Sequence, residues 1–291
     1  MNGGRRLIVT ADDFGLAIPV NEAVEQAHRF GILSAASLMV TGAAARDAVA
    51  RARRMPKLGV GLHLALVDGR PALPPQAVSE LVGPDGRFFD DPWRVGVKIY
   101  CNATARRQAE AEIRAQLLAF WRTGLALDHV NGHHHFHLHP TVQEILLKLA
   151  PEFGIRAIRV PREPPFLAWR ATGEGLMRRL GTWLVQARMT ARMRNRIRAA
   201  GIDTNDWLLG MGDSGHMGVA RLRGYLSHLP LGVSELYFHP AVERWAGSES
   251  WPSGYESRGE FEALTDPDVL ALAKGSGIEP VCFAALGEQA A

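Results

Sequence analysis

Short apolar runs alternate along the chain with longer segments in which apolar residues recur at the spacing of an amphipathic helix. The first run is 7–10, and the helical segment 20–30 that follows it ends at Gly31, a residue typical of a helix C-terminus. Further apolar runs predict strands at 37–41, 58–64, 127–131, 155–160, 207–209, 235–238 and 280–283. Helical spacing predicts helices at 43–55, 104–122, 141–153, 219–229 and 266–274. This alternation predicts a parallel sheet, either closed into a barrel or open and doubly wound.

Two segments depart from this alternation. Residues 67–103, rich in proline and glycine up to residue 95, are expected to form a long inserted loop. Residues 174–200 predict a basic helix, because seven arginines and no acidic residue lie between 176 and 198. No internal repeat divides the chain, so we expect residues 1–291 to form a single domain with these two additions.

The positions of polar residues relative to the strands favour the barrel over the open sheet. Asp12-Asp13 follows the first strand, His63 lies late in the third, and a histidine cluster follows the fourth. The carboxyl ends of several strands meet at one end of a barrel, whereas an open sheet places its site at one switch point. The chain has no G-x-G-x-x-G motif after a strand and no P-loop. We therefore predict a TIM-like (β/α) barrel of the α/β class.

The composition is sufficient for a large buried core and argues against several kinds of partner. Of the 291 residues 47% are hydrophobic, and the net charge is only +3, which argues against nucleic acid. The two cysteines, Cys101 and Cys282, form neither a disulfide framework nor a thiolate zinc motif. No segment has the pattern of a signal peptide or of a membrane-spanning helix. We therefore expect a cytoplasmic location.

The adjacent carboxylates Asp12 and Asp13 are costly together unless a positive charge lies beside them. A divalent cation would supply that charge, with one carboxylate as its ligand and the other free to act as a base. A helix N-terminal cap explains an aspartate in this position about equally well. The pair alone therefore leaves both interpretations open.

The histidines strengthen the metal interpretation. Six of the eleven histidines lie at 129, 133, 134, 135, 137 and 139, a cluster that begins where a predicted strand ends. Neutral imidazole is the commonest metal ligand, and in an extended segment His133, His135 and His137 would share one face against His134. One or two of them are expected to be ligands, and the others to orient them or to contact substrate. The alternative is a surface tract that binds metal adventitiously.

Two further histidines are ambiguous by themselves. His63 lies in an otherwise apolar strand, where a buried structural histidine is the commoner case. His239 also follows a predicted strand and suits either a general acid or a packed side chain. One aspartate and two histidines on a divalent ion leave positions for water and a substrate oxygen, which suits hydrolysis of an amide or an ester.

Several motifs together resemble a known family. These motifs are Thr10-Ala11-Asp12-Asp13-Phe14-Gly15, Gly61-Leu62-His63, the H-x-N-G-H-H-H-x-H run from His129, the segment from Ile158 to Glu163, and Phe238-His239-Pro240. In this order, over nearly the whole chain, they resemble the YdjC-like carbohydrate deacetylases. The resemblance implies an irregular (β/α) barrel that removes the acetyl group of an N-acetylated amino sugar.

The resemblance also implies roles for residues. It implies that Asp13, His63 and His133 bind one divalent ion, either Mg²⁺ or Zn²⁺, and that Asp12 is the general base and His239 the general acid. We expect substrate contacts from His135, His137, Arg159 and Arg162. The chain carries Asn131-Gly132 where many relatives carry Asp-Ser, so a role that needs a carboxylate beside an imidazole is in doubt.

This variant of the histidine run looks most like the hopanoid-biosynthesis-associated branch, often called HpnK. The branch implies an N-acetylglucosaminyl group on a hopanoid lipid as the substrate. The basic helix fits that substrate, since 176–198 combines arginines with a leucine and tryptophan stripe that could lie on the inner face of an anionic membrane. Packing of the same stripe against the barrel, with the arginines in water, is the alternative.

Two other functions remain open at this stage. A metal-dependent phosphoesterase would need a second metal and more carboxylates near the histidines. A non-catalytic sugar-binding barrel would need no base beside the metal, and Asp12 next to Asp13 argues against it. A homodimer is compatible with either function.

Overall fold

An all-parallel sheet of seven strands forms the centre of the computed structural model, which describes residues 4–246 and 254–289. The strand order is β4-β3-β2-β1-β6-β5, and β7 pairs with the amino-terminal part of β1. The strands are β1 (Arg5–Phe14), β2 (Ala35–Leu38), β3 (Gly59–Leu64), β4 (Val130–Gly132), β5 (Trp207–Leu209), β6 (Gly232–Phe238) and β7 (Ile278–Pro280).

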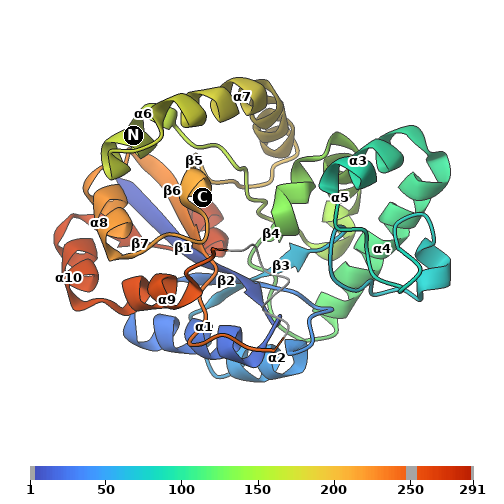
Figure 1. The fold of residues 1–291 in the computed structure, drawn as a ribbon, viewed down its shortest axis with the longest axis horizontal. Coiled ribbons are helices and arrows are strands. Elements are labelled where there is room, and N and C mark those ends of the chain that lie inside the picture. The colour runs from blue at the N-terminus through green and yellow to red at the C-terminus, as the bar shows by residue number, and fades with distance from the viewer. Residues whose placement is uncertain (1–3, 247–253, 290–291) are drawn as a thin grey trace.

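Helices surround this sheet in chain order, as Figure 1 shows. The helices that the sequence predicts are α1 (Ile18–Phe30), α2 (Ala45–Ala52), α4 (Ala103–Trp121), α5 (Pro140–Phe153), α7 (Leu176–Ala199), α8 (Val219–Ser227) and α10 (Pro267–Gly275). The helices that it does not predict are α3 (Pro92–Cys101), α6 (Pro165–Thr172) and α9 (Ser257–Thr265). None of the helices in the described ranges is both long and apolar enough to cross a membrane.

The strand β1 lies at the middle of the sheet. Eight of its ten residues are buried, without the alternation of exposed and buried positions seen in a sheet with one wet face. A parallel sheet covered by helices on its outer face and filled by side chains on its inner face produces such a continuous apolar run. The predicted α/β fold, an irregular barrel in one domain, is confirmed.

The barrel is irregular between β4 and β5. The predicted strand at 155–160 lies there but makes only isolated bridges, from Ile158 to Val130 and from Ala157 to Asp203. The backbone N–H of Val160 donates to the side-chain oxygen of Asn205 instead of to a strand backbone (2.7 Å). The segment therefore fills the place of a strand without forming a regular ladder.

The inserted loop predicted at 67–103 is partly helical. It contains α3 and a short 3-10 helix at Pro75–Val78. The start of α3 has a local signal, because Asp91 caps it by accepting from the N–H groups of Trp93 and Arg94, and Pro92 occupies the first turn. The strand predicted at 280–283 is also misplaced, since β7 ends at Pro280 and a 3-10 helix follows.

Two glycines of β3 leave room for buried polar side chains from the adjacent segment. A Cβ atom at Gly59 would lie 2.7 Å from the carboxyl carbon of Asp128, and one at Gly61 would lie 2.5 Å from the His129 ring. Asp128 and His129 are buried and bonded to each other, with 2.8 Å between Oδ2 and Nδ1. The glycine spacing therefore allows a polar pair to pack against the sheet directly below the carboxyl end of β3.

We expect Gly61→Ala to lower the free energy of unfolding by about 1–3 kcal/mol, because overpacking displaces buried atoms. Gly218→Ala is the matched control, since its φ is −69° and an added Cβ would meet no atom within 4 Å. Urea unfolding measures both variants. Equal stabilities for the two would contradict the role given to Gly61.

Candidate active site

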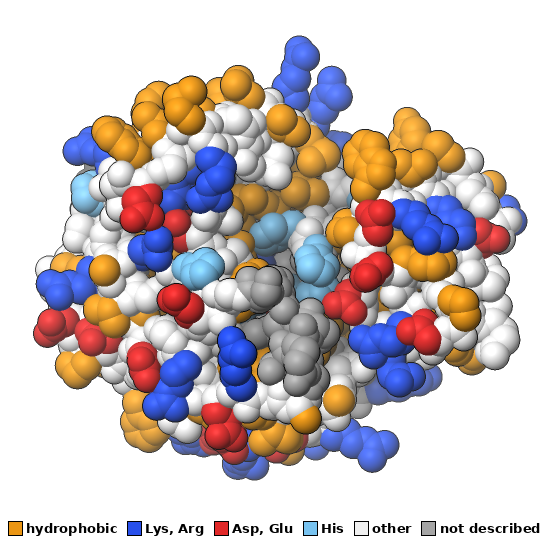
Figure 2. All heavy atoms as spheres, in the orientation of Figure 1, with side chains coloured by type: hydrophobic (Ala, Val, Ile, Leu, Met, Phe, Trp, Pro, Cys, Tyr) orange, Lys and Arg blue, Asp and Glu red, His pale blue; other side chains and the backbone are white. Residues whose placement is uncertain are grey.

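A cavity of about 530 Å³ opens at the carboxyl ends of β1, β3, β4 and β6. Figure 2 shows histidine side chains exposed in a central hollow of this face. The lining residues are Asp12, Asp13, His63, Asp68, Asp90, Pro92, Gly132, His133, His134, His135, Ser214, Tyr237, His239 and Tyr255. The residues that the sequence places after separate strands thus meet at one end of the barrel, as a barrel requires.

A bulge in β1 brings both aspartates to this cavity. Neighbouring residues of a regular strand point to opposite faces, but three steps on β1 from Ala11 to Phe14 match two steps on β2. Asp13 has a φ of 61°, a left-handed conformation that few non-glycine residues adopt. The bulge therefore explains how two adjacent carboxylates line the same cavity.

His63 is held in one tautomer by its neighbour across the strand ladder, Asn131. The Asn131 amide nitrogen donates to Asp12 Oδ1 (3.0 Å) and to Ser37 Oγ (2.8 Å). The amide oxygen must then face His63 Nδ1, at 2.7 Å, and accept its proton. The other ring nitrogen of His63, Nε2, consequently keeps its lone pair directed into the cavity.

The histidine run is not extended, so the predicted alternation of His133, His135 and His137 against His134 is wrong. A 3-10 helix covers His133–Leu138, and His134 and His135 both have left-handed φ values of 52° and 53°. This path directs His133, His134 and His135 to the cavity. His137 is turned inward, where its Nε2 lies 3.1 Å from the carbonyl oxygen of Arg159.

Three atoms in the cavity are arranged as metal ligands. Asp13 Oδ1 lies 3.2 Å from His63 Nε2 and 3.1 Å from His133 Nδ1. The oxygen is buried, yet it has no hydrogen bond of acceptable geometry with any described residue. A buried carboxylate oxygen and two ring nitrogens that converge without a well-formed hydrogen bond favour a cation between them. The three residues therefore fit a divalent ion.

The charges of these groups agree with that arrangement. Burial alone would raise the pKa of Asp13, but the imidazoles of His133 and His63 outweigh it and hold the pKa well below its usual range. Asp13 is therefore a carboxylate, the form that binds metal.

A second group of potential ligands lies toward the mouth of the cavity. It consists of Asp68, His133 and His134, and thus shares His133 with the first group. Asp68 is partly exposed and His134 is exposed, unlike the buried Asp13 and His63. Exposed acidic groups are commonly found without a metal, so the buried group is the stronger candidate.

Behind the cavity, Asp12 forms a buried ion pair with Arg159. Two guanidinium nitrogens donate to the carboxylate at 2.5 and 3.1 Å, and the same guanidinium donates to Glu235 at 2.6 and 2.9 Å. Burial alone would raise the pKa of Asp12, but the charge of Arg159, with a smaller effect of His63, holds it well below its usual range. Asp12 is therefore an oriented, ionised carboxylate.

The same network continues through the barrel core to the polar pair beside β3. Ser37 Oγ, which accepts from Asn131, lies 3.0 Å from His129 Nε2, and His129 Nδ1 bonds to Asp128. Asp128 in turn accepts from the backbone N–H groups of Phe283 and Ala284. A continuous chain of buried hydrogen bonds thus positions the amide that orients His63.

His239 lines the cavity from the end of β6. Its backbone N–H donates to Glu260 Oε2 (2.6 Å), and its ring lies between Tyr237 and Tyr255, with centroids 5.6 and 5.2 Å away. Glu260 is fully buried, and burial raises its pKa. The His239 imidazole therefore borders the same cavity as the Asp12 carboxylate.

The predicted substrate-binding residues separate into two groups. His135 lines the cavity, but Arg159 and His137 are fully buried behind it, where Arg159 binds two carboxylates. Arg162 lines a different cavity, and its guanidinium stacks over Trp207 at 4.4 Å. Arg159, His137 and Arg162 do not line the active-site cavity, and their contact with a substrate stays a prediction.

Several lining residues have no clear signal in the sequence. Asp68 and Asp90 come from the inserted segment, and Ser214, Tyr237 and Tyr255 come from the carboxyl-terminal half. Ser214 Oγ and the Tyr255 hydroxyl lie 3.0 Å apart. Only Tyr237 could have been suspected, since it lies two residues before His239 on a predicted strand and so shares its side of that strand.

We expect Arg159→Met to lower the free energy of unfolding by about 3–5 kcal/mol at neutral pH, because it leaves Asp12 and Glu235 buried without a cation. In the native chain the folded pKa of Asp12 lies below the unfolded value, so its contribution is present at neutral pH and lost as the pH falls. The deficit of the variant should therefore shrink below about pH 4.

Urea unfolding at several pH values measures this difference. Arg223→Met is the matched control, because its exposed pair with Asp268 (3.4 Å) is expected to contribute about 0–1 kcal/mol. A deficit for Arg159→Met no larger than that of the control would show that the buried pair does not stabilise the fold.

Comparisons with known proteins agree with this geometry. The sequence pattern of the YdjC-like protein family matches residues 6–274. A Brevibacillus brevis protein named carbohydrate deacetylase is 42% identical over 162 residues, a match that spans 56% of this chain and only 60% of that protein. A human protein of the same name is 30% identical over 302 residues, covering 94% of this chain and 88% of that protein.

A solved structure from Enterococcus faecalis V583, named for cellobiose-phosphate cleavage, has a TM-score of 0.76 and 22% identity and covers 97% of this chain and 99% of that one. This likeness shows a shared fold. The family resemblance carried by the A-D-D-F-G motif and the histidine run is confirmed, and the narrower assignment to the hopanoid-associated branch stays a prediction. The family pattern covers more than nine-tenths of the sequence, and the chain belongs to the YdjC-like protein family.

Proposed function

We propose that this protein is a metal-dependent deacetylase that hydrolyses the acetamido group of an N-acetylated amino sugar to acetate and a free amine. The observation that carries the proposal is the convergence of Asp13 Oδ1, His63 Nε2 and His133 Nδ1 beside the separate carboxylate of Asp12. Relatives named carbohydrate deacetylase support the same reaction class.

In this proposal Asp13, His63 and His133 hold one divalent ion, which would polarise the acetyl carbonyl and lower the pKa of the attacking water. Mixed nitrogen and oxygen ligands suit Mg²⁺ or Zn²⁺, among other ions. Asn131 keeps the ligand nitrogen of His63 free of a proton by accepting from the other ring nitrogen. An asparagine thereby does for His63 what a carboxylate does in many metal sites.

Asp12 accepts the proton of the attacking water, and His239 donates a proton to the leaving amine nitrogen. Arg159 acts as a positioning residue, since its two hydrogen bonds fix the carboxylate plane of Asp12 and keep it ionised. The low pKa makes Asp12 a weak base. Asp12 can therefore accept the proton only from a water whose own pKa the divalent ion would have lowered.

We expect Asp12→Asn to lower kcat for acetate release by about 10²–10⁴-fold while leaving sugar binding measurable, because it removes the base but keeps the side-chain shape. His133→Ala should lose turnover as well. The matched control is Asp268→Asn, an aspartate 77% exposed on α10. A coupled acetate assay with N-acetylglucosamine conjugates measures turnover, and full activity of Asp12→Asn would reject the assigned base.

We expect Asn131→Ala to weaken divalent-metal affinity by about 10–100-fold, because His63 loses the partner that sets its tautomer. Calorimetric titration of chelator-treated protein with Zn²⁺ measures the affinity, and urea unfolding checks that the variant folds. The control is Asn195→Ala, an exposed asparagine of α7. Unchanged affinity would show that Asn131 does not orient the ligand.

One observation favours a second candidate, a phosphoesterase with two metals, because Asp68, His133 and His134 form a second ligand group. The titration distinguishes the two candidates. One ion per chain, together with acetate release, supports the deacetylase, whereas two ions with phosphate release from phosphorylated sugars would replace it.

We further propose that the amino sugar is attached to a lipid, as the hopanoid-associated branch implies. A groove of about 270 Å³ supports this, since Trp93, Val97, Tyr100 and Phe136 line it and it shares Pro92 with the active-site cavity. An apolar aglycone would lie there while the sugar occupies the cavity. Mass spectrometry of soluble and lipid-linked N-acetylglucosamine conjugates, screened for loss of an acetyl group, tests this substrate.

A further inference from the structure

The basic helix α7 presents apolar side chains to solvent on its outer side. Met177, Leu184 and Val185 are 79%, 69% and 81% exposed. Arg188 and Arg192, which are also exposed, lie on the same side, since residues seven, eight and eleven apart return to one side of a helix. We call these five residues the outer face of α7.

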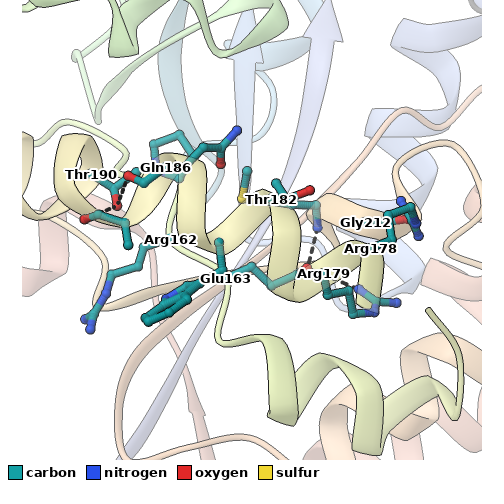
Figure 3. Close-up of a pocket in the computed structure, with 12 residues that line it drawn as sticks. Arg162, Glu163, Arg178, Arg179, Thr182, Gln186, Thr190 and Gly212 are labelled. Atoms are coloured by element: carbon teal, nitrogen blue, oxygen red, sulfur yellow. Dashed lines mark hydrogen bonds and ion pairs between the residues drawn. The ribbon is translucent and has the colours of Figure 1, made fainter. Parts of the chain in front are cut away.

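The inner side of the same helix covers a second cavity. This cavity, of about 180 Å³, lies under α7, and the helix lines it with polar side chains such as Gln186 and with the apolar Trp183 and Ala187 (Figure 3). The buried residues of α7 are Arg179, Thr190, Met193 and Ile197, so apolar side chains are buried only near its carboxyl end.

A surface helix that needs only the barrel as its partner places apolar residues inward and polar residues outward. The central part of α7 departs from this, because Leu184 and Val185 face solvent while the side toward the barrel mixes polar and apolar side chains. The alternative interpretation, a stripe of leucine and tryptophan packed on the barrel, is therefore wrong for Leu184, which is 69% exposed, whereas Trp183 lines the cavity under the helix.

The arginines of α7 divide into two groups. Arg179, Arg194 and Arg198 pair with carboxylates of the same chain. Arg178, Arg188, Arg192 and Arg196 are exposed and form no ion pair within the described part of the chain, although Arg178 donates to the carbonyl oxygen of Gly212. The helix itself contains no acidic residue. The outward surface is therefore both apolar and positively charged.

Neighbouring elements extend this surface. On α6, which packs against α7, Phe166 and Trp169 are 60% and 39% exposed. Figure 2 shows hydrophobic side chains gathered over α6 and α7 and again over α3, on either side of the hollow that contains the histidines. The apolar surface thus borders the entrance to the candidate active site.

We propose that the outer face of α7, together with α6, docks on the surface of an anionic lipid bilayer. Aliphatic and aromatic side chains enter the boundary between headgroups and acyl chains, and unpaired arginines lie at the level of the lipid phosphates. The charge complementarity selects a membrane over an uncharged apolar partner. The docking rests on this surface alone and does not depend on the reaction proposed above.

The test is co-sedimentation of the full chain with vesicles of phosphatidylcholine, with and without phosphatidylglycerol. We expect binding only to the anionic vesicles, weakening as salt is added. Arg188→Gln with Arg192→Gln should weaken binding about 30-fold, because each arginine near an anionic lipid surface raises the affinity about fivefold. Leu184→Gln with Val185→Gln should weaken it about tenfold or more.

Matched controls lie at the opposite end of the barrel. Leu231→Gln changes a leucine that is 66% exposed just before β6, and Arg122→Gln changes an exposed arginine after α4. Both should bind like the native chain, and urea unfolding shows whether each variant is folded. Failure of the native chain to bind anionic vesicles, or equal binding by the outer-face variants, would overturn the proposal. A dimer in sedimentation velocity that Leu184→Gln with Val185→Gln dissociates, without vesicle binding, would assign the face to a second copy instead.

Discussion

The amide of Asn131 links two parts of the candidate site, because it forms hydrogen bonds to both Asp12 and His63. Its nitrogen can only donate to the acceptor-only carboxylate of Asp12, so its oxygen must accept from His63. One side chain therefore orients both Asp12, the proposed base, and His63, a proposed metal ligand. Any other orientation would place two acceptors or two donors face to face in a buried space, which is strongly unfavourable.

This constraint explains why so much of the barrel core at the carboxyl end of the sheet is polar. The hydrogen bonds run from Asp128 through His129, Ser37 and Asn131 to Asp12, and then through Arg159 to Glu235 and Thr10. A buried network is favourable only when its members are satisfied, and the glycines of β3 and the bulge of β1 provide the space and direction that this needs. The backbone conformation of Asp13 is a local cost of bringing two carboxylates to one cavity.

The surface around the site has a different organisation from its interior. Apolar side chains of α3, α6 and α7 remain exposed near the entrance, while α7 covers a second, smaller cavity of mixed lining. Exposed apolar surface promotes association, in contrast to the buried hydrogen bonds that form the site itself. The proposed lipid-linked substrate and the proposed membrane docking both depend on this border.

The barrel class, the polar residues at the strand ends and most of the alternation of strands and helices could be predicted from the sequence, whereas α3, α6 and α9 were not. Hydrophobic periodicity reports which face of an element is buried, and the carboxyl ends of parallel strands must lie at the same end. The sequence therefore indicated that Asp13, His63 and His133 would be neighbours, although they are 50 and 70 residues apart. Asp91 and Pro92 also marked the start of α3, but the proline-rich surroundings obscured it.

Only the tertiary structure could decide the direction of individual side chains. The left-handed backbone at Asp13, His134 and His135 reverses the alternation that a regular strand would give. Arg159 was expected at the substrate and is instead buried behind Asp12, because pairing with Glu235 and Asp12 depends on strands that are distant in sequence. Periodicity records burial along one element, whereas hydrogen-bond partners, backbone bulges and the exposed side of α7 depend on what the rest of the chain places beside them.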